Sequence, residues 1–360
     1  MGCCSDCTRS RVLYGRCLTP RESSPTVTGE KLRAPRNRTL YLRAGERRRL
    51  RSRVASSSDL SHGYLDRTIL GDYREIVPLL PKGFADLVFL DPPYNRNAEF
   101  GGTRFSKRAV DEYSTWLGKA LDTLLPTLKP TGTVYICGDW FTSASIFVAA
   151  SARLYVRNRI TWEREKGRGA KSNWKNASED IWFCTKSGEY TFNVDAVKLR
   201  RKVIAPYRDR GGEPRDWSEG ADGNFRDTHP SNLWTDITVP FWSMPENTDH
   251  PTQKSEKLLA KLILASTDAD DVVFDPFLGS GTTAVVARKL GRHYVGIDCV
   301  EEFALLTEKR LSLCAEDPSI QGYVGRVFWE RNTLQTGKRA VRHLSKGYEQ
   351  SGIRPAALNG

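Results

Sequence analysis

Short apolar runs alternate with amphipathic stretches along this chain from about residue 64 onward. The apolar runs have the length of buried strands and occupy residues 86–90, 133–138, 155–163, 180–186, 272–277 and 293–298. Apolar residues at three- and four-residue spacing predict helices at residues 111–128, 143–154, 256–266, 282–290 and 301–311. This alternation predicts an α/β fold, with a mostly parallel sheet covered by helices on both faces.

Residues 195–249 interrupt the pattern, because glycine, proline, tryptophan and charged residues replace the alternating runs. Such a stretch is too long for an ordinary loop in a compact fold, so we predict a functional insertion. Residues 95–107 are predicted to form a polar, glycine-containing loop. Six of the nine tryptophans fall between Trp162 and Trp242, and burial in the core would explain most of them.

The positive charge of the chain is concentrated at its two ends. The formal net charge is +12, but residues 1–53 contain fourteen Lys and Arg against four acids, and residues 334–360 contain five against one. We therefore expect a disordered basic leader at residues 1–55 and a C-terminal extension at residues 316–360. Within the body, residues 153–215 contain sixteen basic and eight acidic side chains, an excess that suits phosphate binding.

Cysteine usage and hydropathy predict a cytoplasmic protein. Four of the eight cysteines lie in the first seventeen residues, and no second CxxC or HxxxH motif accompanies Cys4 and Cys7 at the spacing of a zinc site. We expect reduced thiols and no bound metal. No run of eighteen apolar residues is present, so no membrane span is predicted, and the start has no apolar signal-peptide core.

The apolar run before residue 91 ends abruptly in Asp91-Pro92-Pro93-Tyr94, within the stretch LVFLDPPYN. Proline cannot donate to a sheet ladder, and two consecutive prolines make the backbone a stiff corner. A carboxylate and an aromatic ring are thereby held at the end of a buried strand. This rigidity favours a site whose hydrogen-bond acceptors are fixed before a substrate arrives.

A second motif, VVFDPFLGSGTTA at residues 272–284, predicts a strand, a glycine-rich turn and the start of a helix. Gly279 and Gly281 permit positive φ and close approach of the backbone to a ligand. No Lys-Ser/Thr pair follows the glycines, so the turn is not an NTP phosphate loop. Gly279, Gly281 and Ala284 fit the GxGxxG/A pattern, and Asp298 ends the next strand where it could bind ribose hydroxyls. These features together predict a nucleoside cofactor.

Three motifs together resemble those of the amino-methylating DNA methyltransferases that use S-adenosylmethionine. DPPY at residues 91–94 resembles their catalytic motif, DPFLGSGTT at residues 275–283 their cofactor loop, and HPTQK at residues 250–254 the segment before that loop. The motif order resembles the permuted beta group, and the resemblance covers roughly residues 69–313. One departure is Ser255, where these enzymes usually carry proline. Both residues favour a helix start.

The resemblance implies a Rossmann-like methyltransferase fold with a mostly parallel seven-stranded sheet and a circularly permuted motif order. Residues 64–194 would form the catalytic half, residues 195–249 a target-recognition insertion, and residues 250–315 the half that binds S-adenosylmethionine. The implied substrate is double-stranded DNA, from which the target base is extruded because a paired base is out of reach. A cognate restriction endonuclease and a second copy of the chain are the further partners, with the protein held at the bacterial nucleoid through DNA.

The resemblance also implies roles for single residues. The catalytic residues would be Asp91, Pro92, Pro93 and Tyr94. The Asp91 carboxylate and the Pro92 carbonyl would accept the two N–H bonds of an exocyclic amino group, so that its lone pair points at the methyl donor. Tyr94 would stack on the extruded base. No covalent nucleophile is required.

The cofactor residues implied by the resemblance come from three segments. Thr252 and Lys254 would contact the carboxylate of the cofactor, and Asp298 its ribose. Asp72 is either a simple turn residue or a contact to the adenine ring. The full set is Asp72, His250, Thr252, Lys254, Asp275, Phe277, Gly279, Ser280, Gly281, Thr282 and Asp298.

DNA recognition is expected in residues 157–175 and 195–249, where basic and aromatic residues are interleaved. The basic residues expected to contact DNA are Arg164, Lys166, Arg168, Lys171, Lys175, Arg200, Arg201 and Lys202.

Other functions remain open from the sequence. Aspartate at the first position of the corner resembles the adenine-N6 enzymes, whereas cytosine-N4 enzymes more often carry serine there, so N4-methylation of cytosine is the principal alternative. A nicotinamide-dependent oxidoreductase would use the same glycine turn, but would leave DPPY, HPTQK and the basic insertion without a purpose. A DNA-binding module without turnover is a third possibility.

Overall fold

The computed structural model describes residues 34–100, 103–164, 172–203, 207–220 and 223–331. The chain divides into two units, residues 1–35 and residues 36–360. Of the first unit only Ala34 and Pro35 are described, and all of the described helices and strands belong to the second unit.

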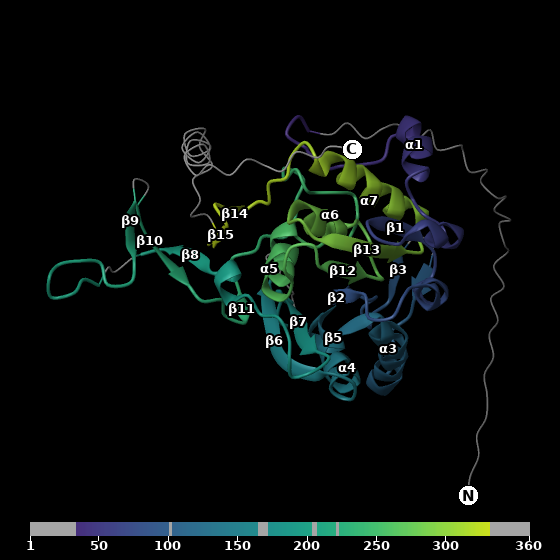
Figure 1. The fold of residues 1–360 in the computed structure, drawn as a ribbon, viewed down its shortest axis with the longest axis horizontal. Helices are drawn as coiled ribbons and strands as arrows, with labels where there is room; N and C mark the ends of the chain where they lie inside the picture. The colour runs from purple at the N-terminus through teal and green to yellow at the C-terminus, as the bar shows by residue number, and fades with distance from the viewer. Residues whose placement is uncertain (1–33, 101–102, 165–171, 204–206, 221–222, 332–360) are drawn as a thin grey trace, which may run out of the picture. The chain divides into compact units, whose positions relative to one another are not determined.

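A sheet of eight strands forms the centre of this unit, in the order β1-β13-β12-β2-β5-β7-β6-β11 (Figure 1). Its neighbouring strands are parallel, except that β7 runs antiparallel to both β5 and β6. The sheet is therefore mixed, and it has eight strands where seven were predicted, because the two-residue β11 pairs with β6. The bounds are β1 Arg67–Leu70, β2 Ala85–Leu90, β5 Leu128–Gly138, β6 Tyr155–Glu163, β7 Ser178–Thr185, β11 Leu233–Trp234, β12 Val272–Asp275 and β13 His293–Asp298.

Helices cover both faces of the sheet, as the sequence predicts. Along β2, Leu87 and Phe89 pack into the apolar cluster on the α5 and α6 side, whereas Val88 and Leu90 pack into the cluster on the α3 and α4 side. This alternation follows from the two-residue period of a strand. The main helices are α2 Tyr73–Ile76, α3 Val110–Leu124, α4 Trp140–Ser151, α5 Glu256–Ser266, α6 Thr282–Lys289 and α7 Glu301–Cys314, and short 3-10 helices cover Ser57–His62, Val77–Leu79, Leu125–Thr127 and Val194–Val197.

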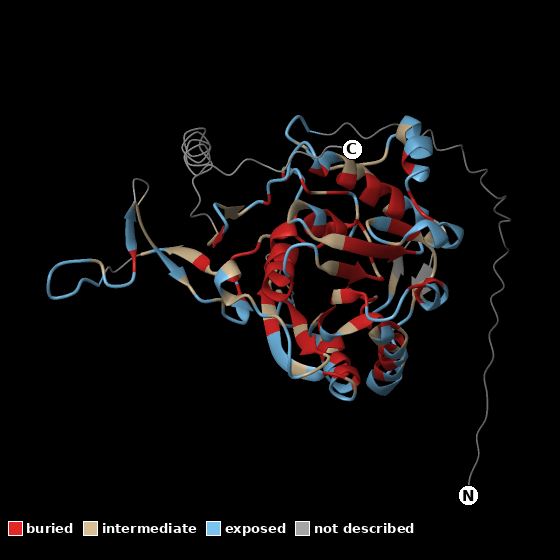
Figure 2. Ribbon diagram, viewed as in Figure 1, coloured by how far each residue is buried: buried red, intermediate tan, exposed pale blue. Residues whose placement is uncertain are grey.

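Helix α5 is buried along its whole length (Figure 2). Ser255 is its N-cap residue with an extended backbone, although its side chain makes no capping hydrogen bond. The helix therefore begins at the predicted place despite the departure from proline. Because α5 follows HPTQK directly, its fixed position also fixes that segment beside the sheet.

The predicted disordered leader is wrong for residues 36–55. A 3-10 helix at Ala44–Glu46 and helix α1 at Arg47–Arg51 lie in this stretch, and the side chain of Leu50 is fully buried. Leu50 packs with Ala304 and Leu305 of α7, while Arg47 and Arg51 form ion pairs with Glu302 and Glu301. Apolar packing and ion pairs thus attach a strongly basic segment to the domain.

Two local predictions also need correction. The segment predicted as a polar loop contains a hairpin of β3 Ala98–Phe100 and β4 Thr103–Phe105. The helix predicted over residues 111–128 ends earlier, at Leu124, and passes through a 3-10 turn that contains Pro126 into β5. Proline within that turn removes a backbone donor, which explains why the α-helix does not continue.

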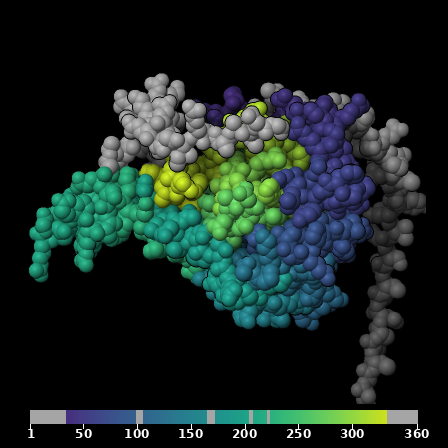
Figure 3. Space-filling model, in the orientation of Figure 1, coloured from purple at the N-terminus to yellow at the C-terminus, as the bar shows by residue number. Residues whose placement is uncertain are grey.

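The insertion at residues 195–249 contributes to a second sheet of five strands, ordered β14-β15-β8-β10-β9. Strand β15 comes from the C-terminal extension and pairs in parallel with β8. In the space-filling view the yellow C-terminal segment accordingly lies against the teal segment that contains β8 (Figure 3). The bounds are β8 Leu199–Lys202, β9 Ser218–Gly220, β10 Gly223–Thr228, β14 Tyr323–Val324 and β15 Val327–Trp329.

Candidate active site

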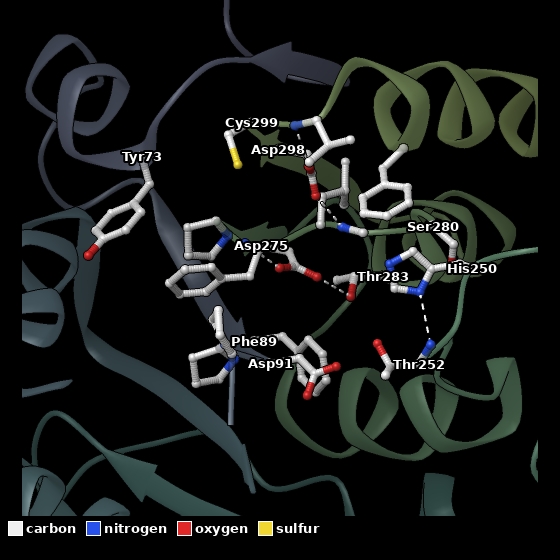
Figure 4. Close-up of a pocket in the computed structure, with 18 of the residues that line it drawn as sticks. Tyr73, Phe89, Asp91, His250, Thr252, Asp275, Ser280, Thr283, Asp298 and Cys299 are labelled. Carbon is white, nitrogen blue, oxygen red and sulfur yellow. Dashed lines mark hydrogen bonds between the residues drawn. The ribbon is translucent and has the colours of Figure 1, made fainter. Parts of the chain in front are cut away.

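The two sequence motifs line one cavity of about 530 Å³ (Figure 4). Strands β2 and β12 are parallel neighbours in the sheet, with Val88 opposite Phe274. Because parallel strands end at the same edge, Asp91 after β2 and the glycine turn after β12 reach the cavity together. The segment at residues 250–254 contributes His250, Thr252 and Lys254 to the same wall.

Hydrogen bonds from the α3 and α4 region hold the corner at residues 91–95 in place. The hydroxyl of Tyr113 donates to the Pro93 carbonyl at 2.8 Å. The backbone N–H of Asn95 donates to Thr142 Oγ1 at 3.0 Å, and the Asn95 side chain exchanges two hydrogen bonds with the backbone of Arg108. The corner is thus fixed by proline geometry and by its neighbours.

Lys254 contacts the corner at residues 91–95, although the resemblance implied a contact to the cofactor's carboxylate. Its Nζ donates to Asp91 Oδ2 at 2.6 Å and to the Tyr94 hydroxyl at 3.2 Å. Burial alone would lower the pKa of Lys254, but attraction to Asp91 and Glu179 outweighs it and raises that pKa above its usual value. Lys254 is therefore a cation beside Asp91 at neutral pH, not a proton acceptor.

The second oxygen of Asp91, Oδ1, is buried and has no hydrogen-bond donor among the described residues. A buried carboxylate oxygen without a donor is unfavourable unless a ligand supplies one. Because Asp91 lines the cavity, this oxygen suits an N–H group bound there.

Tyr94 is nearly buried, with 9% of its surface exposed. Its ring lines the cavity, and the guanidinium carbon of Arg96 lies 5.5 Å from the ring centroid. A ring that already attracts a guanidinium has a face suited to flat, polarisable groups. The resemblance assigned a face of this ring to a base.

The glycine turn approaches its neighbours closely. Gly279 has φ +55°, and a Cβ atom there would lie 3.1 Å from Nε2 of His250. Gly281 has φ +75° at the start of α6, and a Cβ atom there would meet the Thr307 side chain at 2.4 Å. Gly281 does not line the cavity, so its role is to let the backbone turn into α6. Gly279 leaves space for a ligand against the backbone.

Two buried carboxylates order this turn. Asp298 accepts the backbone N–H groups of Gly279 at 2.7 Å and Val300 at 2.8 Å. Asp275 accepts the Phe277 N–H at 2.9 Å and the Thr283 hydroxyl at 2.6 Å (Figure 4). Burial raises the pKa of Asp275 to about 7 and that of Asp298 to about 6, against the opposing effect of these hydrogen bonds.

His250 completes this side of the cavity. Its ring packs edge-on against Phe303 at a centroid distance of 4.4 Å, and its Nδ1 accepts the Thr252 N–H at 3.3 Å. Burial lowers the pKa of His250 to about 4, with Asp91 opposing and Lys254 adding to that shift. The imidazole is therefore neutral at physiological pH.

The other residues assigned to the cofactor line the cavity, and each of them also contacts a neighbouring side chain. Asp72 lines the cavity but also caps α2, where it accepts from the Arg74 N–H and guanidinium. Phe277 lines the cavity beside the Tyr73 ring, at a centroid distance of 5.1 Å. Ser280 and Thr282 line it too, and both contact the buried guanidinium of Arg310 from α7. The sequence did not single out Arg310, because a basic residue within a helix repeat usually lies at the surface.

The chain matches one family model over residues 85–309, the N6/N4 methyltransferase family described as DNA methylase. The chain belongs to this DNA methylase family. It is 31% identical over 297 residues to "DNA adenine methyltransferase YhdJ" of Escherichia coli strain K12, which covers 80% of this chain and 94% of YhdJ. It is 29% identical over 273 residues to "Type II methyltransferase M.BglII" of Bacillus subtilis, which covers 73% of each.

Among solved structures, the DNA methylase is similar to the "M1.HpyAVI-SAM complex". That likeness covers 68% of this chain and 98% of the other, at 22% sequence identity and a TM-score of 0.43.

The residues expected to bind DNA lie in different settings on this methylase. Lys175 and Lys202 are exposed. Arg164 pairs with Glu179, Arg200 with Asp227 at 2.7 Å, and Arg201 with Glu330 at 3.5 Å. These arginines already have carboxylate partners within the protein. Lys166, Arg168 and Lys171 lie outside the described residues.

The described part of the methylase contains neither a metal site nor a membrane span. No group of three or more His, Cys, Asp or Glu side chains there could hold a metal ion. No helix in the same ranges is both long and apolar enough to cross a membrane.

Proposed function

We propose that this DNA methylase transfers a methyl group from S-adenosylmethionine to the exocyclic N6 of adenine in double-stranded DNA. The observation that carries the proposal is the shared cavity, in which the Asp91 carboxylate and the glycine turn at Gly279 face the same space. Asp91 Oδ1, which has no donor among the described residues, is the acceptor for the amino group. The motif order further supports placing the chain in the permuted beta group.

The cavity fits a nucleoside cofactor on the side of the glycine turn. Gly279 provides close backbone approach, Phe277 an apolar wall, and Thr252 and Ser280 hydroxyl groups. His250, neutral beside Asp91, adds no charge that would repel a sulfonium cation. When bound, S-adenosylmethionine supplies the methyl group. Asp298 is already engaged with two backbone N–H groups, so it would contact the ribose with its remaining lone pairs.

The catalytic corner would act on the amino nitrogen, whose lone pair is delocalised into the ring and is a weak nucleophile. Asp91 Oδ1 and the Pro92 carbonyl accept its two N–H groups and hold the lone pair toward the methyl donor. The stiff corner keeps both acceptors in place beforehand, and such alignment is worth up to roughly 7–11 kcal/mol of the barrier. As the N–CH₃ bond forms, the bond between the methyl group and the donor sulfur would break and leave a neutral thioether, and Asp91 Oδ1 would accept the proton that the nitrogen gives up.

The target base must leave the duplex to reach this corner. Tyr94 offers its ring face, and stacking there is worth about 1–3 kcal/mol per base. The Arg96 guanidinium lies near that ring, so the base would replace or join it. Residues 195–249 form the target-recognition region in this proposal, with Lys175 and Lys202 as exposed phosphate contacts.

The test is mass analysis of nucleosides from duplex DNA incubated with the protein and S-adenosylmethionine. N6-methyladenine is the expected product. N4-methylcytosine alone would replace our assignment by the second candidate, cytosine-N4 methylation, which the N6/N4 family also includes. Omission of S-adenosylmethionine and replacement by NADH are the controls, because an oxidoreductase would bind NADH and leave DNA unmodified.

A further inference from the structure

Four charged side chains of alternating sign form a chain behind the catalytic corner, and its two middle members are buried. It runs from Arg164 through Glu179 and Lys254 to Asp91. Arg164 donates to Glu179 Oε1, Lys254 Nζ lies 3.5 Å from Glu179 Oε2, and the same Nζ lies 2.6 Å from Asp91 Oδ2. Glu179 is 4% and Lys254 7% exposed. We name this set the Arg164–Asp91 charge chain.

The topology of the sheet brings these residues to one edge. Asp91 follows the end of β2, and Arg164 follows the end of β6. Strand β7 runs in the opposite direction, so its second residue, Glu179, lies at this edge, paired in register with Trp162. Among the described strands of the large sheet, only β7 begins at the edge where its neighbours end, because it is antiparallel to them.

Burial makes each member depend on its neighbours. A buried ammonium or carboxylate is costly unless opposite charges surround it. Lys254 lies between two carboxylates, and Glu179 lies between two cations. If the Glu179 charge is removed, Lys254 keeps a single carboxylate partner, and its ammonium is no longer fixed between two carboxylates.

The orientation of Asp91 follows from this arrangement. Lys254 binds only Oδ2, and Oδ1 has no donor among the described residues. The charge chain therefore distinguishes the two oxygens of one carboxylate. A shift of about 1 Å in an aligned group can lower the rate roughly 100-fold. A group that fixes the position of Lys254 therefore affects the rate of the proposed methyl transfer.

We propose that Glu179 is a positioning residue that holds the Lys254 ammonium against Asp91 Oδ2 and thereby turns Oδ1 toward the amino group of the substrate. This inference rests on the proposed methyl transfer. Arg164 fixes Glu179 from the other side and links the corner to the segment that follows β6. Glu179 touches neither substrate nor cofactor in this role.

The experiment compares Glu179→Gln with the wild-type full-length chain in steady-state methylation of duplex DNA. We expect kcat to fall about 10- to 100-fold, while KM for DNA and the dissociation constant of S-adenosylmethionine stay unchanged. Glu308→Gln is the matched control, because Glu308 is a similarly buried carboxylate at 7% exposure on α7. Its kcat should equal that of the wild type.

The pH dependence of kcat gives a readout that a merely structural role would not move. The titratable groups around the Lys254 ammonium come from four segments of the chain: Asp91, Tyr94, Cys137, Glu179 and His250. Without the Glu179 charge, less attraction holds the proton on Lys254, so its pKa falls. The alkaline loss of activity should then begin at lower pH in Glu179→Gln than in the wild type or in Glu308→Gln.

The positioning role would be overturned by a folded Glu179→Gln variant that has wild-type kcat and loses activity at the same alkaline pH as the wild type. The proposed methyl transfer itself would not be affected by that result. A variant that loses only DNA affinity would overturn the positioning role as well. If the wild-type protein transfers no methyl group, the proposed function fails and this inference fails with it. Should Glu179→Gln not fold, Glu179→Asp keeps the pair with Arg164 but withdraws from Lys254, and wild-type kcat in that variant would also reject the role.

Discussion

A Cβ atom on Gly279 would lie 3.1 Å from Nε2 of His250, and Gly279 itself has φ +55°. The turn after β12 and the segment before α5 are therefore as close as their backbones and side chains allow. Two separate costs would follow from any side chain at this position, one conformational and one steric.

We predict that Gly279→Ala weakens binding of S-adenosylmethionine at least about tenfold, because the methyl group pushes His250 into the cavity and strains the turn by about 1–2 kcal/mol. Isothermal titration calorimetry measures the binding. Gly291→Ala is the control, since Gly291 has φ +70° with nothing within 4 Å of the added atom. Equal weakening in both variants would assign the effect to backbone strain alone.

Removal of the proposed hydrogen-bond acceptor, Asp91, should abolish most of the activity. Asp91→Ala is expected to lower kcat by at least about 100-fold, as for other preorganised hydrogen-bonding groups, with S-adenosylmethionine still bound. Transfer of a labelled methyl group to duplex DNA measures the rate. Asp122→Ala, which removes an exposed ion pair with Arg153, should keep wild-type kcat. An active Asp91→Ala protein would exclude the assigned role.

The contribution of Asp275 to stability should fall as pH rises from about 4 through about 7. Burial raises the pKa of Asp275 from 3.8 to about 7, so the folded state keeps a proton that the unfolded state has lost. The contribution of this carboxyl group to the free energy of unfolding is fully present below about pH 4. It decreases by up to about 1.4 kcal/mol per pH unit as the pH rises across that window. Urea unfolding of the wild type and of Asp275→Asn at several pH values tests this, with a flatter profile expected for the variant. Identical slopes would show that Asp275 does not titrate in this range.

The basic segment at residues 36–55 should contribute to stability through Leu50. Leu50→Ala is expected to lower the free energy of unfolding by about 2–5 kcal/mol, because the side chain is fully buried against Ala304 and Leu305. Chemical denaturation measures the change, and Leu79→Ala, at a position 57% exposed, should have little effect. N-terminal truncations should therefore remove no residue beyond residue 35. If a protein that lacks residues 36–55 were as stable as the wild type, the stabilising role of this packed segment would be contradicted.

The exposed Trp174 offers a test of the DNA surface. Trp174 is 94% exposed on the connection between β6 and β7, whose base is closed by the Arg164 N–H to Ala177 carbonyl hydrogen bond. Trp174→Ala should weaken duplex binding by about 1–3 kcal/mol through lost stacking without changing the melting temperature. Fluorescence anisotropy with a labelled duplex is suitable. Tyr155→Ala, 59% exposed at the opposite end of β6, should bind normally.

Local pattern was enough to predict most of the elements. The strands at β6 and β13 and the helix after Ser255 coincide with the predicted runs, because strand and helix periods are properties of neighbouring residues. The roles that the resemblance implied for the DPPY and glycine-loop motifs require the two to lie close together, and one cavity contains residues of both.

Contacts between distant residues were not predictable in this way. Leu50 is one apolar residue within ERRRLRSR, and its contact with α7, together with the ion pairs of Arg47 and Arg51, shows that the segment is packed. Lys254 was assigned from a motif, but a motif does not specify which carboxylate a flexible side chain will reach. Glu179 is one of many acids in the chain, and its place beside Lys254 depends on the reversed direction of β7.

The parallel pairing of β15 with β8 limits how this protein can be engineered. The region proposed to read the DNA sequence is not a self-contained cassette, because a strand encoded some hundred residues downstream completes its sheet. Transplanting residues 195–249 alone into a relative would leave an unprotected β edge, which invites association between chains. A swap of specificity would have to carry the donor's β14–β15 hairpin along with the insertion.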